Sequence, residues 1–114
     1  MSDRLSPGQN LPIGQSIISG NGEYRLAMQH DGNLVLYDKT GKALWASNTN
    51  NVAIQTCAMQ SDGNLVLYRY DGHAQWASNT HGKPGAYLVM QNDGNAVIYY
   101  DEKPKAVWAT GTNQ

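Results

Sequence analysis

The sequence repeats itself three times, with a period of about 31 residues. A ten-residue segment that begins with Met-Gln recurs in closely similar form, and a tryptophan follows each copy. Between positions 29–49 and 60–80, 15 of 21 residues are identical. Such regularity in 114 residues predicts a single domain, residues 1–114, in which three similar units share one core. The repeated glutamines are Gln29, Gln60 and Gln91, and the tryptophans are Trp45, Trp76 and Trp108.

Each repeat carries the signals of short β-strands separated by turns. The β-prone run 34–37 lies between Asp31-Gly32-Asn33 and a turn at 38–42. No stretch keeps an apolar stripe at helical spacing for even eleven residues, so the sequence predicts an all-β fold. We expect equivalent turns at 61–64, 69–73, 92–95 and 100–105, and at least one further strand within 14–21.

Alternation along the strands predicts two faces. Leu34 and Leu36 point to one face, whereas Val35 and Tyr37 point to the other. About four strands per repeat, arranged as three sheets around a pseudo-threefold axis, would make a closed triangular prism with the tryptophans near its centre. A β-trefoil is the alternative architecture. The expected core comprises Leu26, Met28, Leu34, Leu36, Met59, Leu65, Leu67, Leu88, Met90, Ala96 and Ile98.

A five-residue set, Q-x-D-x-N-x-V-x-Y, recurs on the outward face. A hairpin loop accounts for its Asp and for the glycine, but not for the retention of two amides, a valine and a phenol in every copy. Carboxylate, amide and phenol groups can hydrogen-bond the vicinal hydroxyls of a sugar, and valine offers an apolar patch to the ring. We therefore expect three carbohydrate-binding sites. Their residues are Gln29, Asp31, Asn33, Val35, Tyr37, Gln60, Asp62, Asn64, Val66, Tyr68, Gln91, Asp93, Asn95, Val97 and Tyr99.

This motif, followed each time by W-A-[ST]-x-T, resembles the bulb-type mannose-binding lectins of monocots, the B-lectin or β-prism II family, over residues 14–112. The resemblance implies three four-stranded antiparallel sheets and calcium-independent, multivalent binding of α-mannosides or high-mannose glycans through three equivalent sites. It implies that the Gln, Asp, Asn and Tyr side chains bind the O2, O3 and O4 hydroxyls of mannose. It also implies that a C-terminal strand, around 106–110, completes the first sheet or is exchanged within a homodimer.

The single cysteine, Cys57, marks a departure from that resemblance. Plant members pair a cysteine in the middle of the D-x-N loop, where this chain has Gly32, with a second one before the next motif. One cysteine cannot form this bridge, so the resemblance is closer to the disulfide-free members found outside plants. We expect Cys57 to be a buried small hydrophobe or a surface thiol.

Composition excludes several other classes. Lys and Arg total 8 against 9 for Asp and Glu, a formal net charge of -1, which leaves no basic excess for nucleic acid or an anionic membrane. No apolar run reaches the roughly 18 residues of a membrane span, so membrane insertion is not expected. With no signal peptide or disulfide visible, a cytoplasmic or non-classically exported protein is favoured. No cofactor or metal is expected, because the residues after Asn33 offer no further oxygen ligands for calcium.

An enzyme and a protein–protein adaptor are the rival interpretations. His30, His73 and His81 occupy unrelated repeat positions, which indicates no catalytic cluster. The motif aspartates should lie on different sheets, too far apart to act as a glycosidase pair at about 5–9.5 Å. We therefore expect no enzyme. An adaptor could use the same prism as a scaffold, but degenerate sites would favour it, and all three copies are intact.

Overall fold

The computed structural model describes residues 2–100 and 105–114, in which twelve β-strands and no helix are found, so the all-β prediction is confirmed. Nothing in this part of the chain is a helix long and apolar enough to cross a membrane. The expected turn at 100–105 lies, for residues 101–104, outside the described residues. The strands are β1 (Arg4–Leu5), β2 (Asn10–Pro12), β3 (Ser16–Ile18), β4 (Tyr24–Met28), β5 (Leu34–Asp38), β6 (Ala43–Ala46), β7 (Ile54–Met59), β8 (Leu65–Arg69), β9 (Ala74–Ala77), β10 (Tyr87–Met90), β11 (Ala96–Tyr100) and β12 (Lys105–Ala109).

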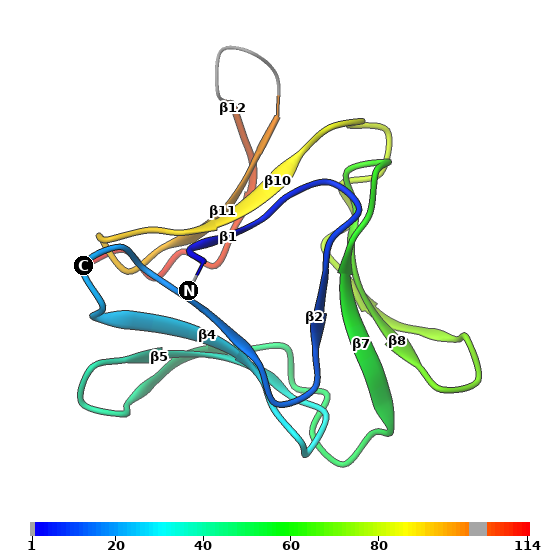
Figure 1. Cartoon of the computed structure of the whole chain (residues 1–114), viewed down its shortest axis with the longest axis horizontal. Coiled ribbons are helices and arrows are strands. Elements are labelled where there is room, and N and C mark those ends of the chain that lie inside the picture. Colours follow the sequence, from blue (N-terminus) through cyan, green and yellow to red (C-terminus); the bar gives the residue numbers. More distant parts are fainter. Residues whose placement is uncertain (1, 101–104) are drawn as a thin grey trace.

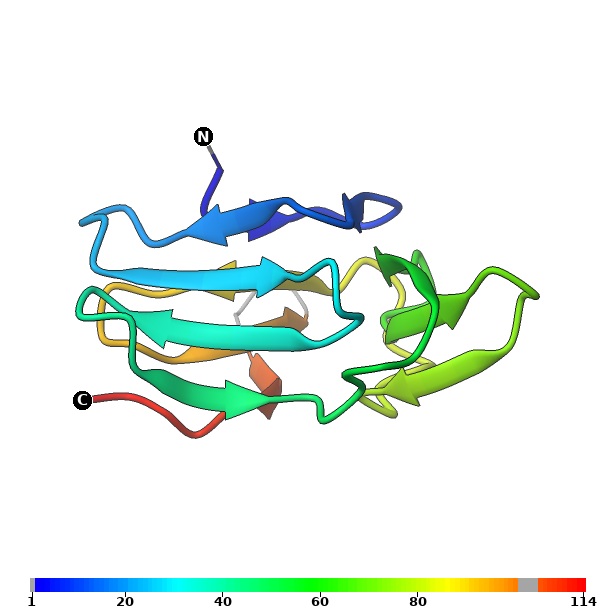
Figure 2. The same cartoon turned by 90° about the horizontal axis from the view of Figure 1, so that it is seen from below.

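Three four-stranded antiparallel sheets form the sides of a prism (Figure 1). Their strand orders are β3-β4-β5-β6, β2-β7-β8-β9 and β1-β10-β11-β12. Seen from the side, the strands of a sheet are stacked along the prism axis, with the N-terminal strands at one end (Figure 2). Within each sheet, three consecutive strands of one repeat form a meander.

The fourth strand of each sheet comes from the N-terminal segment, which corrects the expectation of about four strands per repeat. This segment runs around one end of the prism and adds β1 to β10, β2 to β7 and β3 to β4. Its inward residues, Leu5, Leu11 and Ile17, belong to the common core. The predicted strand within 14–21 is β3. Strands β1 and β2 were not predicted; they are only two and three residues long, and alternation alone does not reveal them.

The C-terminal strand β12 pairs with β11 of its own repeat, with Ile98 opposite Trp108. It does not complete the sheet of the first repeat, so that part of the expectation is wrong. The first sheet already has its fourth strand from β3, and its other edge is β6. The local β11–β12 pairing repeats the β5–β6 and β8–β9 arrangement in the other two sheets.

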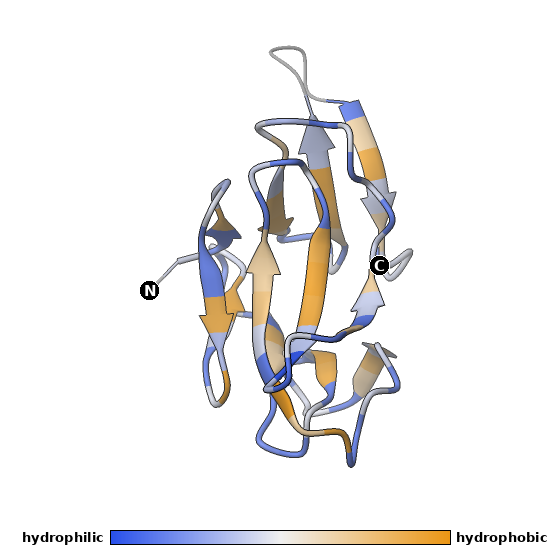
Figure 3. Ribbon diagram, turned by 90° about the vertical axis from the view of Figure 1, so that its right-hand side faces the viewer, coloured by the Kyte–Doolittle hydropathy of each residue, from blue (hydrophilic) through white to orange (hydrophobic). Residues whose placement is uncertain are grey.

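The predicted core is confirmed. All eleven expected core residues are at most 1% exposed, and hydrophobic residues gather in the strands while hydrophilic ones gather mainly in the turns (Figure 3). Cys57 joins this core as a free thiol, and burial raises its pKa to about 12. It is therefore a buried small hydrophobe, one of the two roles expected for it.

The three tryptophans meet around the prism axis, as predicted. Their rings contact one another edge to face, with centroids 5.5 to 5.7 Å apart. Because β6, β9 and β12 are the edge strands opposite the N-terminal ones, the indoles close that end of the prism and are only partly buried.

Candidate carbohydrate-binding sites

Each five-residue motif begins in the hairpin that joins the two middle strands of its sheet. Between β4 and β5, the backbone N–H of Gln29 donates to the backbone carbonyl of Asn33 at 2.9 Å, and the backbone N–H of Gly32 donates to the backbone carbonyl of Gln29 at 3.1 Å. The Asp31 carboxylate accepts a hydrogen bond from the backbone N–H of Asn33 at 2.9 Å. The other two hairpins make the same bonds. The fold thus brings the five motif residues together on the outer face of each sheet.

The glycine in the middle of each D-G-N loop is required by geometry. Gly32 and Gly63 have φ values of 91° and 95°, a region that favours glycine. A Cβ atom at Gly32 would lie 2.1 Å from the Val52 carbonyl oxygen, and one at Gly63 would lie 2.3 Å from that of Lys83. The backbone that follows each repeat therefore packs directly on the loop, which holds the motif in place.

The glutamine amide links the tyrosine to the aspartate. With the Gln29 amide nitrogen facing Asp31, this nitrogen donates to the carboxylate at 3.2 Å, and the amide oxygen accepts from the Tyr37 hydroxyl. The third site has the same arrangement, whereas in the second Gln60 donates to the Tyr68 hydroxyl. These side chains are ordered before any ligand binds, which lowers the entropic cost of binding.

The asparagine side chain is anchored by the segment after the tryptophan. In the second site, the Asn64 Oδ1 atom accepts from the Ser78 hydroxyl at 3.3 Å and from the Thr80 amide at 3.2 Å. The Thr80 hydroxyl in turn donates to the Gly63 carbonyl at 2.6 Å. The Asn64 oxygen therefore belongs to a hydrogen-bond network and is not free to bind a ligand. Its Nδ2 group has no partner within the described residues and is available to a ligand.

Sequence reasoning assigned a role to the tryptophan of the W-A-[ST]-x-T segment but none to its two hydroxyl residues, although they recur three times. The structure shows that its two hydroxyl residues hold the motif asparagine and the hairpin together. The residue between them has positive φ, 60° at Asn48 and 61° at Asn79. Gly111 takes that position in the third repeat, with φ 73°.

The motif valines differ from the expectation of an open apolar patch. Val35, Val66 and Val97 are only 2–3% exposed. Each lies between two neighbouring strands, with alanine on at least one side: Ala27 and Ala46 flank Val35, whereas Val89 and Ala109 flank Val97. The valines therefore form the floor of each site beneath the polar side chains.

The three sites share the hydrogen bonds of their loops and asparagines, but they differ in the orientation of the glutamine amide and in their surroundings. The loops that carry Asp31, Asp62 and Asp93 belong to three different sheets, as expected. The residue opposite the motif tyrosine differs in each: Arg25 faces Tyr37, Thr56 faces Tyr68 and Tyr87 faces Tyr99.

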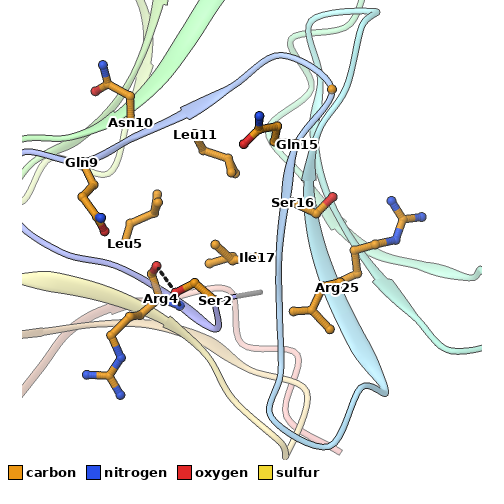
Figure 4. Close-up of a pocket in the computed structure, with 12 residues that line it drawn as sticks. Ser2, Arg4, Leu5, Gln9, Asn10, Leu11, Gln15, Ser16, Ile17 and Arg25 are labelled. Atoms are coloured by element: carbon orange, nitrogen blue, oxygen red, sulfur yellow. Dashed lines mark hydrogen bonds between the residues drawn. The ribbon is translucent and has the colours of Figure 1, made fainter.

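A pocket of about 530 Å³ lies apart from the motifs, at the N-terminal end of the prism. Leu5, Leu11 and Ile17 converge there, while the guanidinium groups of Arg4 and Arg25 point away from it (Figure 4). The three apolar side chains are only 2–5% exposed, so they offer a ligand little surface. Among the described residues, no group of three or more His, Cys, Asp or Glu side chains is placed to hold a metal ion.

The fold and the threefold motif define a β-prism II lectin, and comparison with known proteins agrees. A monomeric monocot mannose-binding lectin from Gastrodia elata is 47% identical, with a TM-score of 0.84, over 99% of this chain and 100% of that one. The Marasmius oreades lectin is 32% identical, with a TM-score of 0.89, over 98% and 92%. A domain-swapped lectin dimer from Mycobacterium smegmatis is 43% identical, with a TM-score of 0.57, over 92% and 95%.

Comparison of sequences without structures finds fewer relatives over a smaller part of the chain. No protein-family model matches the chain. The B-type lectin plumieribetin from Scorpaena plumieri is 41% identical over 54 residues, a match that spans about half of each protein, 46% of this chain and 46% of plumieribetin. Taken with the structural relatives, these findings show that the chain belongs to the bulb-type, or B-type, lectin family.

Proposed function

We propose that residues 1–114 form one lectin domain that binds mannose and mannose-containing glycans through three sites, without calcium. The observation that carries this proposal is the same pre-formed set of polar groups on each of three sheets. The structural relatives described as mannose-binding support the choice of sugar.

The hydrogen bonds within each site determine what it offers a sugar. Because the asparagine oxygen is occupied, its Nδ2 group is the donor toward a ligand. The aspartate uses one oxygen to accept from the loop amide and keeps further acceptor capacity. In the first and third sites the tyrosine hydroxyl donates to glutamine and so presents its lone pairs. One donor together with two acceptors suits neighbouring hydroxyls, each of which both donates and accepts.

The experiment is a calorimetric titration with methyl α-mannoside and methyl α-galactoside in the presence of EDTA. We expect mannoside binding with a dissociation constant on the order of 1 mM, about 4 kcal/mol. Galactoside, in which O2 is equatorial and O4 axial, should bind more weakly because its hydroxyls do not meet the same groups. Equal affinities for the two sugars, or loss of mannoside binding in EDTA, would contradict the proposal.

We also infer that the domain can form a homodimer through β12. This strand is the edge of its sheet, so a partner's β12 in the same place would restore the same hydrogen bonds with β11. Relatives include both a protein described as monomeric and one described as a domain-swapped dimer. Light scattering of the purified protein tests this inference, and a monomer at all concentrations would reject it.

A further inference from the structure

The residue beside each motif tyrosine distinguishes the three sites. Directly opposed residues on paired strands have Cβ atoms about 4.5–5.5 Å apart, so a sugar that contacts the tyrosine also lies near its neighbour. Of the three neighbours, Arg25, Thr56 and Tyr87, only Arg25 is charged. The first site thus differs from the others in charge as well as in shape.

Arg25 is placed to receive an anion. Its guanidinium lies over the Tyr37 ring, 4.8 Å from the centroid, which restrains the plane of the group. The side chain is exposed and has no ion pair or hydrogen bond with any described residue. A guanidinium held in this way retains its N–H donors for a planar or tetrahedral oxyanion.

The nearby carboxylates are engaged elsewhere. Glu23, on the residues leading into β4, forms an ion pair with Lys39 at 3.1 Å. The Asp38 carboxylate accepts from the Thr40 hydroxyl at 2.6 Å and from amides of its own turn. The Gln29 amide stands between the Asp31 carboxylate and the Tyr37 hydroxyl. An anion beside Arg25 would therefore be separated from the carboxylate of the motif.

Resting on the proposed function, we propose that Arg25 makes the first site selective for mannosides that carry an anionic group, in particular a phosphate monoester. The sugar ring occupies the motif Gln29–Tyr37, and the phosphate oxygens accept hydrogen bonds from the guanidinium. In the second site the residue opposite the tyrosine is the uncharged Thr56, and in the third the guanidinium of Arg4, which lies over Tyr87, is paired with Asp3, so neither site prefers the charged sugar.

The test is a site-resolved NMR titration, in which the side-chain amides of Asn33, Asn64 and Asn95 report on one site each. Mannose 6-phosphate and methyl α-mannoside are titrated separately. At Asn33 we expect mannose 6-phosphate to bind about fivefold more tightly than methyl α-mannoside, because exposed charge pairs contribute little free energy. At Asn64 and Asn95 we expect the two sugars to bind with equal affinity.

Three variants make the test specific. Arg25→Gln should abolish the preference at Asn33, and Thr56→Arg should create one at Asn64. Arg4→Gln is the matched control, since Arg4 also lies over a tyrosine, Tyr87, but is paired with Asp3 at 3.4 Å. It should leave the preference at Asn33 unchanged.

The outcomes separate this inference from the proposed function. No response to methyl α-mannoside at any of the three asparagines would reject the proposed function itself. A response to methyl α-mannoside without a preference for mannose 6-phosphate at Asn33, or a preference that survives Arg25→Gln, would overturn only the role of Arg25. Inorganic phosphate that binds the first site as tightly as mannose 6-phosphate would also overturn it.

Discussion

At the scale of single residues, each site depends on groups that never touch a ligand. The loop glycines allow the following backbone to pack on the hairpin, and the hydroxyls after the tryptophan hold the asparagine oxygen. The polar motif residues of the proposed sites are thus of two kinds. Asparagine serves both the fold and the site, whereas aspartate is exposed and can be changed with little effect on the fold.

Two glycines of the second repeat separate backbone strain from steric overlap. Gly63 and Gly72 have φ values of 95° and 85°, but a Cβ atom meets the Lys83 carbonyl only at Gly63 and nothing within 4 Å at Gly72. Gly72→Ala should lower the free energy of unfolding by about 1–2 kcal/mol, the cost of a left-handed non-glycine residue. Gly63→Ala should lower it by clearly more and disturb the second site. Urea denaturation measures both, and equal losses would show that the contact with Lys83 is unimportant.

Asp62→Asn tests the second site without disturbing its loop. An asparagine at position 62 can still accept a hydrogen bond from the backbone N–H of Asn64, which lies 3.0 Å from the Asp62 carboxylate. The free energy of unfolding should therefore change by no more than about 0.5 kcal/mol. Loss of the charged acceptor should weaken mannoside binding at Asn64 about 10- to 100-fold, because hydrogen bonds to charged groups contribute about 1.5–3 kcal/mol. Asp71→Asn, on the other loop of the same repeat, is the control. Unchanged binding at Asn64 would remove Asp62 from the site.

At the scale of elements, the edge strands β6, β9 and β12 are joined by their tryptophans. Trp76 contacts both other indoles, at 5.6 and 5.7 Å between centroids. Trp76→Ala should destabilise the domain by about 3 kcal/mol, the lower end of the range for tryptophan because the ring is partly exposed. Tyr70→Ala, at a side chain that is 69% exposed, should change stability little. Equal unfolding midpoints for the two variants would refute a structural role for the indole cluster.

Repetition made most of these elements predictable. Three copies of one pattern indicated the hairpins, the inward leucines and the convergence of the tryptophans. A feature that recurs at the same position in all three repeats can be told apart from one that varies between them. Strands β1 and β2 escaped prediction since they occur once each and are held by partners far along the chain. The anchoring of Asn64 and the burial of the valines could not be predicted either, because alternation gives the direction of a side chain but not what covers it.

At the scale of the whole molecule, three weak sites on one rigid body should act together on clustered glycans. Linking sites of millimolar affinity can raise avidity by about 10²–10⁴. The protein should therefore agglutinate mannan-coated beads at concentrations well below the dissociation constant for methyl α-mannoside. If a strictly monomeric protein still agglutinates the beads, multivalent binding is supported and the homodimer is rejected. If the protein binds mannan-coated beads no more tightly than it binds free mannoside, both multivalent binding and the homodimer are rejected.

The wrapping of the N-terminal segment around the prism sets an order of events during synthesis. Ser16 pairs with Ala27, Asn10 with Ala58 and Arg4 with Val89, so sequence separation grows from 11 to 48 to 85 residues. The pairings are nested, so β1, the first of these three strands to be synthesised, is the last of them to find its partner. Closing the longest loop costs about 2 kcal/mol more than closing the shortest. A nascent chain that lacks the third repeat must therefore wait with β1 unpaired, and the prism closes only after the third repeat has been synthesised.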